Sequence, residues 1–164
     1  MRFTGLLYRA LNPIHAREPL SGESARKHGG RFNPKGMPAL YASLSVMTAI
    51  REANQIGTLQ PTTLVACEAD VGPILDATNA GELNRCGFTA ADLAADDWRA
   101  DMRLIGKSPT QVLAERLKES GFAGMQARSF AKGATAADLN LVLWVWGPDL
   151  PTRLRLVDDE RRLG

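Results

Sequence analysis

Short apolar runs separated by polar turns dominate the chain, and they predict strands. Five runs are rich in β-forming residues and are bounded by Gly, Pro or Asn. The most apolar run, Leu-Asn-Leu-Val-Leu-Trp-Val-Trp, predicts a central strand, while the alternation of Arg and Leu in the last run predicts an edge strand with one wet face. The predicted strands cover residues 6–9, 39–42, 62–71, 139–146 and 153–157.

Helical periodicity occurs in three places. Ser45 caps a predicted helix over residues 46–56, which Gly57 follows. Thr89 begins an alanine-rich helical stretch, and Ser108, followed by proline, begins the clearest helix. Strands outnumber helices and the helices interrupt them irregularly, so the pattern favours the α+β class.

One long segment, residues 13–38, has no periodicity and is predicted to be a loop. Loops of this length in a compact chain are usually functional. Both histidines, His15 and His28, lie within it. The chain has no Gly-rich phosphate loop of the common types, no HExxH and no GxSxG motif.

Length, charge and cysteine usage narrow the class of protein. The 164 residues fit one domain, 1–164, and 20 basic against 18 acidic residues give a net charge of +2. This balance argues against a nucleic-acid or membrane surface, and no apolar stretch is long enough to span a bilayer. With no visible secretory signal, we expect a cytoplasmic protein whose two cysteines, Cys67 and Cys86, are free thiols and bind no metal.

The candidate chemistry starts in the segment Gly-Gly-Arg-Phe-Asn-Pro-Lys-Gly. Two glycines and two prolines fix an unusual backbone path around Arg31 and Lys35, and a guanidinium on a stiff loop suits phosphate or carboxylate. Tyr41 follows ten residues later in a predicted strand, and Glu52 follows eleven residues after that in the next helix. From these residues alone, a surface arginine and a core tyrosine remain open as alternatives.

Four segments together resemble the RES domain, a family named for an Arg, a Glu and a Ser. They are Tyr-Arg at 8–9, GGRFNPKG, ALYASLS and AIREA. Arg31 and Glu52 match the family arginine and glutamate, and the serine is best placed at Ser129. Phe32 stands where the family often has tryptophan. Members are toxins of RES–Xre toxin–antitoxin pairs.

The resemblance implies an ADP-ribosyltransferase-like α+β fold: a split β-sheet around an NAD cleft, with flanking helices. The expected activity is cleavage of NAD, as substrate and without a metal, with mono-ADP-ribosylation of a cytoplasmic protein that arrests growth. The alternative is an NAD glycohydrolase or phosphorylase that depletes cellular NAD, and a second alternative is a non-catalytic binding module. The expected partner is a cognate Xre-type antitoxin that blocks the cleft.

The resemblance and the chemistry of NAD together assign roles to five residues. Arg31 and Arg9 are expected to bind the pyrophosphate, and Tyr41 to face the cationic nicotinamide ring. Glu52 is expected to stabilise the oxocarbenium-like ribose and to orient the acceptor, and Ser129 to hydrogen-bond the ribose or the carboxamide.

Each role has a plain alternative. Arg9 could form an ordinary ion pair, and Glu52 could lie on a wet helix face. Contacts of Lys35 or His15 with a ligand are also open, although both are more typical of surface residues.

Overall fold

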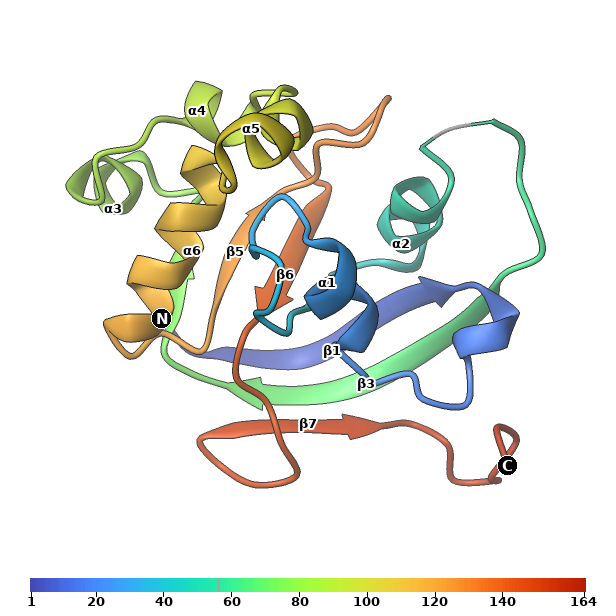
Figure 1. The fold of residues 1–164 in the computed structure, drawn as a ribbon. Coiled ribbons are helices and arrows are strands. Elements are labelled where there is room, and N and C mark those ends of the chain that lie inside the picture. The colour runs from blue at the N-terminus through green and yellow to red at the C-terminus, as the bar shows by residue number, and fades with distance from the viewer. Residues whose placement is uncertain (56) are drawn as a thin grey trace.

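The computed structural model describes residues 1–55 and 57–164 and shows seven strands in one hydrogen-bonded sheet (Figure 1). The strand order is β4-β5-β6-β2-β1-β3-β7. The strands are β1 (Phe3–Leu11), β2 (Leu40–Ser43), β3 (Thr63–Val71), β4 (Ile74–Asp76), β5 (Gly124–Arg128), β6 (Leu139–Leu143) and β7 (Thr152–Leu156). The helices are the 3₁₀ helix η1 (Pro13–His15), α1 (Glu23–His28), α2 (Val46–Ala53), α3 (Ala80–Arg85), α4 (Ala90–Ala94), α5 (Trp98–Ile105) and α6 (Pro109–Glu119).

The sheet consists of two parts that meet at a narrow junction. β1 and β3 pair antiparallel along their whole length, whereas β1 pairs with β2 where Tyr8 lies opposite Ser43. In Figure 1, β5 and β6 run steeply across the direction of β1, β3 and β7. The α+β class is therefore confirmed, and the junction gives the sheet the split that the resemblance implies.

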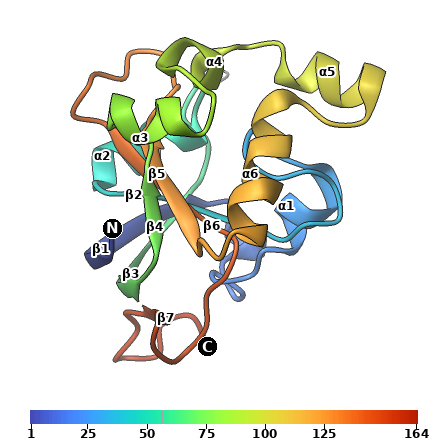
Figure 2. The same cartoon turned by 90° about the vertical axis from the view of Figure 1, so that its left-hand side faces the viewer.

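The apolar residues of β6 supply both cores of the molecule. Leu141 and Leu143 belong to one buried cluster, and Val142 and Trp144, which directly follows β6, belong to the other. Successive side chains of a strand point to opposite faces, so a strand buried on both faces is apolar throughout. The predicted central position of this strand is confirmed. Helix α6, whose cap at Ser108 is also confirmed, packs Leu113 and its neighbours beside β5 and β6 (Figure 2).

Several predicted boundaries are corrected. The segment 13–38 contains η1 and α1 and is not a continuous loop. Strands β4 and β5 were not predicted, because β4 has three residues and Gly, Gln and Arg interrupt the apolar pattern of β5. The stretch after Thr89 forms two helices, α4 and α5. Helix α2 is capped by Ser45 as predicted and ends at Ala53, and the predicted end at Ile56 lies outside the described residues.

Strand β7 lies at the edge of the sheet, as the alternation of its residues predicts. Cys67 is buried, Cys86 is partly buried, and both are free. None of the helices in the described part of the chain is long and apolar enough to cross a membrane.

Candidate active site

The carboxylate of Glu52 accepts hydrogen bonds from three side chains. Its Oε1 accepts from the Ser129 hydroxyl and from Asn140 Nδ2, at 2.5 Å in the case of Asn140, and its Oε2 accepts from Gln55 Nε2 at 2.7 Å. Hydrogen bonds to an ionised group are stronger than neutral ones, so the two donors to Oε1 orient the carboxylate, and the exposed Gln55 adds a bond at Oε2. Glu52 is partly buried, and the alternative of a wet helix face does not hold.

The donors to Glu52 are themselves oriented by the sheet. Ser43 and Asn140 are partners in the β2–β6 register, and the Ser43 hydroxyl donates to Asn140 Oδ1 at 2.7 Å. This bond turns Nδ2 of Asn140 toward Glu52. The backbone amide of Ser129 donates to the Asp138 carbonyl at 2.8 Å, which fixes the residue whose hydroxyl reaches Glu52.

Asp138 ties helix α2 to the segment that carries Ser129. Its Oδ1 accepts from the Thr48 hydroxyl and from Arg51 Nη1, both at 2.6 Å, and its Oδ2 accepts from the Thr135 amide at 2.7 Å. The Thr135 amide, the Thr48 hydroxyl and the Arg51 charge lower the pKa of Asp138 to about 2. The ion pair holds the helix of Glu52 against the segment of Ser129.

Arg31 connects the glycine-rich segment to the chain between α4 and α5. Its Nη1 donates to the carbonyls of Leu93, at 2.9 Å, and Ala95, at 2.7 Å, and its Nη2 lies 3.4 Å from Asp96 Oδ1. Its side chain is 14% exposed, and burial lowers the pKa of the guanidinium. Within the described residues no acceptor meets Nε, so part of the guanidinium fork remains available to a ligand.

Tyr41 is anchored by its hydroxyl, which donates to Asn33 Oδ1 at 2.7 Å and accepts from the Phe32 amide at 3.0 Å. Asn33 is fully buried, and its Nδ2 donates to the carbonyls of Ala25 and Met37. Burial raises the pKa of Tyr41, which keeps its hydroxyl protonated. Tyr41 therefore fits both alternatives from the sequence. Its hydroxyl is bonded inside the protein as in a core tyrosine, and the residue also lines a cavity.

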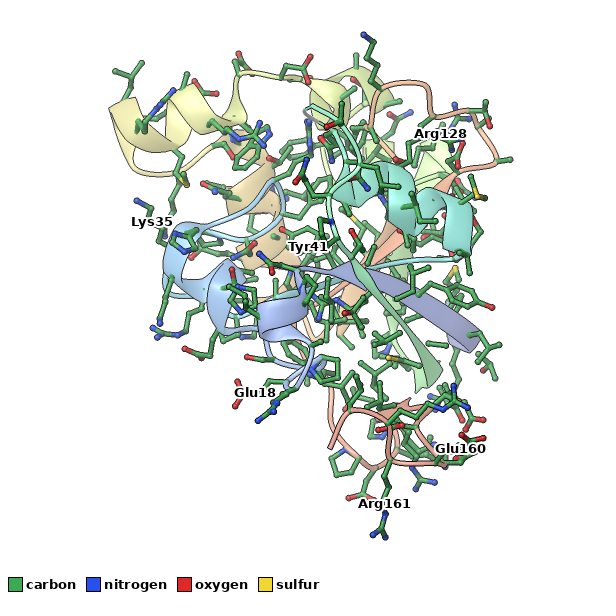
Figure 3. The ribbon with its side chains drawn as sticks, turned by 90° about the vertical axis from the view of Figure 1, so that its right-hand side faces the viewer. Glu18, Lys35, Tyr41, Arg128, Glu160 and Arg161 are labelled. Carbon is green, nitrogen blue, oxygen red and sulfur yellow. The ribbon has the colours of Figure 1, made fainter. Side chains whose placement is uncertain are left out.

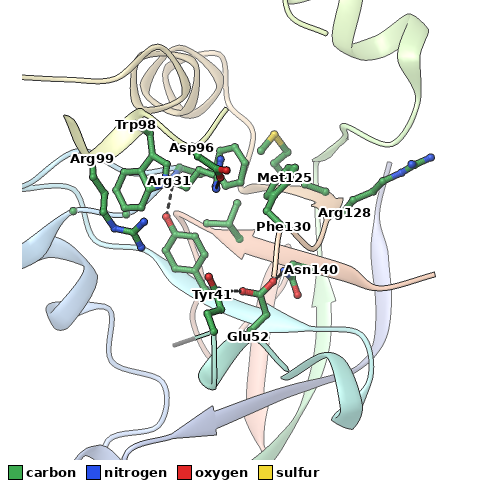
Figure 4. Close-up of a pocket in the computed structure, with 16 residues that line it drawn as sticks. Arg31, Tyr41, Glu52, Asp96, Trp98, Arg99, Met125, Arg128, Phe130 and Asn140 are labelled. Carbon is green, nitrogen blue, oxygen red and sulfur yellow. Dashed lines mark hydrogen bonds and ion pairs between the residues drawn. The ribbon is translucent and has the colours of Figure 1, made fainter. Parts of the chain in front are cut away.

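Two cavities meet at Glu52, Tyr41 and Asn140. The larger, of about 370 Å³, is lined by Arg31, Tyr41, Glu52, Asn140 and twelve further residues (Figure 4). The smaller, of about 260 Å³, is lined by Tyr8, Arg9, Ala10, Tyr41, Ala42, Ser43, Ala49, Glu52, Ala53 and Asn140. Arg31, Tyr41 and Glu52, the residues to which the resemblance gives catalytic roles, thus lie around one cavity.

Arg9 and Ser129 lie beside that cavity and do not line it. Arg9 borders the smaller cavity, and its guanidinium donates to the backbone carbonyls of Tyr41, at 2.9 Å, and Pro19. No acidic partner meets Arg9 in the described part of the chain, and burial lowers its pKa. Ser129 is buried behind Glu52. Both residues contact a site residue directly.

Lys35 and His15 lie away from the two cavities. Tyr41 lies near the middle of the molecule in Figure 3, and Lys35 lies at its outer edge. His15 is exposed on η1. In the described residues, no cluster of three or more His, Cys, Asp or Glu side chains could hold a metal ion.

Most residues of the larger cavity were not selected from the sequence as site residues, among them Trp98, Arg99, Phe130 and Asn140. Asn140 left a signal, because it is the single polar residue in the most apolar run of the chain. Trp98 appeared only as an apolar position in a helical stretch, although its ring faces Arg31. Phe130 left no signal, since its place depends on the path of the chain after β5.

Comparison with known proteins identifies the family and supports the fold. A sequence model of the RES domain matches residues 6–163. No curated protein matches the chain in sequence. Among solved structures, a chain in the crystal structure of the M. tuberculosis MbcT–MbcA toxin–antitoxin complex has a similar fold: the TM-score is 0.67 at 22% identity, over 96% of this chain and 84% of that one. Because the family model spans nearly the whole sequence, this chain belongs to the RES domain family.

Proposed function

We propose that this protein is the toxin of a toxin–antitoxin pair, and that it cleaves the nicotinamide–ribose bond of NAD and transfers the ADP-ribosyl group to a cytoplasmic protein. The observation that carries the proposal is the Glu52 carboxylate, held by three donors where two cavities meet. Membership of the RES domain family and the similarity to a chain of a toxin–antitoxin complex support the same assignment.

Glu52 has the chemistry that this bond cleavage requires. As nicotinamide leaves, positive charge develops on the anomeric carbon and ring oxygen of the ribose, as in glycoside hydrolysis. A carboxylate whose orientation is already fixed stabilises that charge without having to reorganise during the reaction. Once the bond is broken, the same carboxylate can accept a proton from the incoming nucleophile.

The lining of the larger cavity fits the other parts of NAD. Its volume of about 370 Å³ falls in the range of small-molecule sites, roughly 300–1,000 Å³. The Tyr41 ring offers an aromatic face to the nicotinamide cation, and Arg31 offers positive charge to the pyrophosphate. The hydrogen bonds of Arg9 to two carbonyls support a second role for that residue, which is to hold β1 against Tyr41.

A second candidate function is destruction of NAD by hydrolysis or phosphorolysis. The smaller cavity favours it, because this cavity reaches Glu52 from a different set of residues and its volume of about 260 Å³ suits a small acceptor. The partly buried guanidinium of Arg9 on its wall would attract phosphate. In both candidates the leaving group is nicotinamide and the reacting carboxylate is Glu52; only the acceptor differs.

The proposed partner is an Xre-type antitoxin that covers the cleft. If the activity arrests growth, as proposed, the cell that makes the protein needs an inhibitor of it. The MbcT–MbcA complex, in which one chain has a similar fold, is a precedent for a toxin–antitoxin pair.

The deciding experiment incubates the purified protein with cell lysate and NAD labelled on the adenylate phosphate, with Glu52→Gln in parallel. We expect a discrete labelled protein band that the variant lacks. Loss of NAD without a labelled band would replace transfer by hydrolysis or phosphorolysis, and omission of phosphate would separate those two. If the wild type neither labels a protein nor consumes NAD, the proposed function is wrong and a binding module takes its place.

A further inference from the structure

A stack of alternating guanidinium groups and aromatic rings lies along one wall of the larger cavity. The guanidinium carbon of Arg99 lies 4.4 Å from the centre of the Trp98 ring, and that of Arg31 lies 6.0 Å from the same ring. Arg31 also lies 4.6 Å from the ring of Phe130. Cations within about 6 Å of an aromatic face are attracted to it, so the stack fixes the positions of two positive charges.

The two arginines differ in their partners. The guanidinium of Arg31 is mostly occupied by the carbonyls of Leu93 and Ala95 and by Asp96. Arg99 is exposed and lines the cavity, and in the described part of the chain no carboxylate or carbonyl binds its guanidinium. In Figure 4 its side chain extends from the Trp98 ring toward Tyr41, whereas Arg128 points away from the cavity.

The guanidinium groups of Arg31 and Arg99 lie on this wall, and the carboxylates of Glu52 and Asp96 line the same cavity. Burial is the main cause that lowers the pKa of Arg31; Asp96 opposes the shift, and the nearby charge of Arg99 adds to it. Asp96 is a weak counter-charge, because its side chain is 96% exposed and lies 3.4 Å from Arg31. Two like charges facing one concave space favour the binding of an anion there.

We propose that Arg99 is a substrate-binding residue of the larger cavity, and that its guanidinium binds the pyrophosphate of a dinucleotide beside Arg31. The inference rests on the proposed use of NAD. The unoccupied fork of Arg99 can donate two hydrogen bonds to phosphate oxygens, a geometry that lysine does not reproduce. Trp98 positions Arg99, since the guanidinium packs on the face of its ring.

The test compares the binding of ADP and adenosine by calorimetry, with the wild type and Arg99→Ala. Arg103→Ala is the matched control, because Arg103 is an exposed arginine of the same helix that does not line the cavity. We expect Arg99→Ala to weaken ADP binding roughly tenfold, as for loss of a charged hydrogen bond, and to leave adenosine binding and the control unchanged. Arg99→Lys should recover only part of the loss. The KM for NAD should rise in Arg99→Ala while kcat stays near the wild-type value.

The opposing outcomes are distinct. Equal weakening of ADP and adenosine would mean that Arg99 shapes the cavity and binds no phosphate, and unchanged ADP binding or no ADP binding by the wild type would also overturn the inference. If the wild type consumes NAD and Arg99→Ala has an unchanged KM, the inference fails while the proposed function stands. If the wild type binds ADP through Arg99 but consumes no NAD, the proposed function fails while the anion site stands.

Discussion

The hydroxyl of Ser129 donates a hydrogen bond to the carboxylate of Glu52, although the two residues are 77 positions apart in the sequence. Ser129 is buried and does not line the larger cavity, whereas Glu52 does. The single proton of the hydroxyl is therefore directed at Glu52. This geometry favours a positioning role for Ser129 over the direct contact with ribose or carboxamide that the resemblance implies.

Ser129→Ala separates these two roles. Removing the hydroxyl leaves Asn140 and Gln55 as the donors to Glu52 and loses a hydrogen bond to a charged group, so the free energy of unfolding should fall by about 1.5–3 kcal/mol. A positioning role predicts a lower kcat for NAD cleavage with little change in KM. A higher KM at constant kcat would assign the hydroxyl to the substrate instead. Ser120→Ala, at an exposed serine at the end of α6, is the control. It should change the free energy of unfolding, kcat and KM little.

Glu52→Gln should lower kcat for NAD cleavage by about 10²–10⁴-fold, because the amide removes the negative charge that stabilises the transition state. The fold should persist, since the amide oxygen still accepts from Ser129 and Asn140 and the exposed Gln55 can turn away. Steady-state kinetics measure the loss of kcat, and NAD titration measures whether the variant still binds NAD. Glu68→Gln, an exposed glutamate on β3, is the matched control. Full activity in Glu52→Gln would refute the assigned chemistry.

The lowered pKa of Asp138 predicts how the free energy of unfolding changes at acidic pH. Its pKa of about 2 in the folded protein lies below the ordinary value of about 3.9 for Asp. The ionised carboxylate therefore stabilises the fold above about pH 4, and this contribution is lost as the pH falls from about 4 through 2.

Denaturant unfolding at a series of pH values should show a shallower loss of stability between pH 4 and 2 in Asp138→Asn than in the wild type. The variant should also have a lower Tm at pH 7, because the amide cannot form the ion pair with Arg51. Asp149→Asn, at an exposed aspartate without a side-chain hydrogen bond in the described residues, should follow the wild-type profile. Parallel profiles for all three proteins would contradict the prediction.

Much of the fold was predictable because local signals determine it. Ser45 and Ser108 begin helices where their side chains cap free backbone amides, and the apolar β6 is buried on both faces. The predicted β7 has its edge position because its polar face needs water. In contrast, the three-residue β4 and the mixed-polarity β5 are stabilised by pairing with distant strands, which no local pattern records.

The candidate site likewise contains residues that the sequence could identify and residues that only the strand order places there. Arg31, Tyr41 and Glu52 lie within a stretch of 22 residues, in the segments that carry the resemblance to the RES domain, so the sequence alone could single them out. Asn140 and Phe130 reach the cavity because β6 pairs with β2 and because the chain crosses beside α4 after β5. Their position depends on strand order, which the sequence pattern does not determine.

Gly30 links the glycine-rich segment to the site, and its replacement gives the last prediction. A Cβ at Gly30 would lie 2.6 Å from the Tyr41 hydroxyl and 2.7 Å from Asn33 Oδ1, the two atoms whose hydrogen bond anchors the ring. Since real contacts of a Cβ are longer, Gly30→Ala must displace Tyr41 or open the loop. Overpacking of this kind costs about 1–3 kcal/mol, and the displaced ring should raise the KM for NAD.

Gly147→Ala, where a Cβ meets no atom within 4 Å, is the control and should change stability by less than about 0.5 kcal/mol. Thermal unfolding and NAD kinetics measure both effects, and a Gly30→Ala variant as stable and active as Gly147→Ala would show that the close approach of backbone and tyrosine is not required for the site.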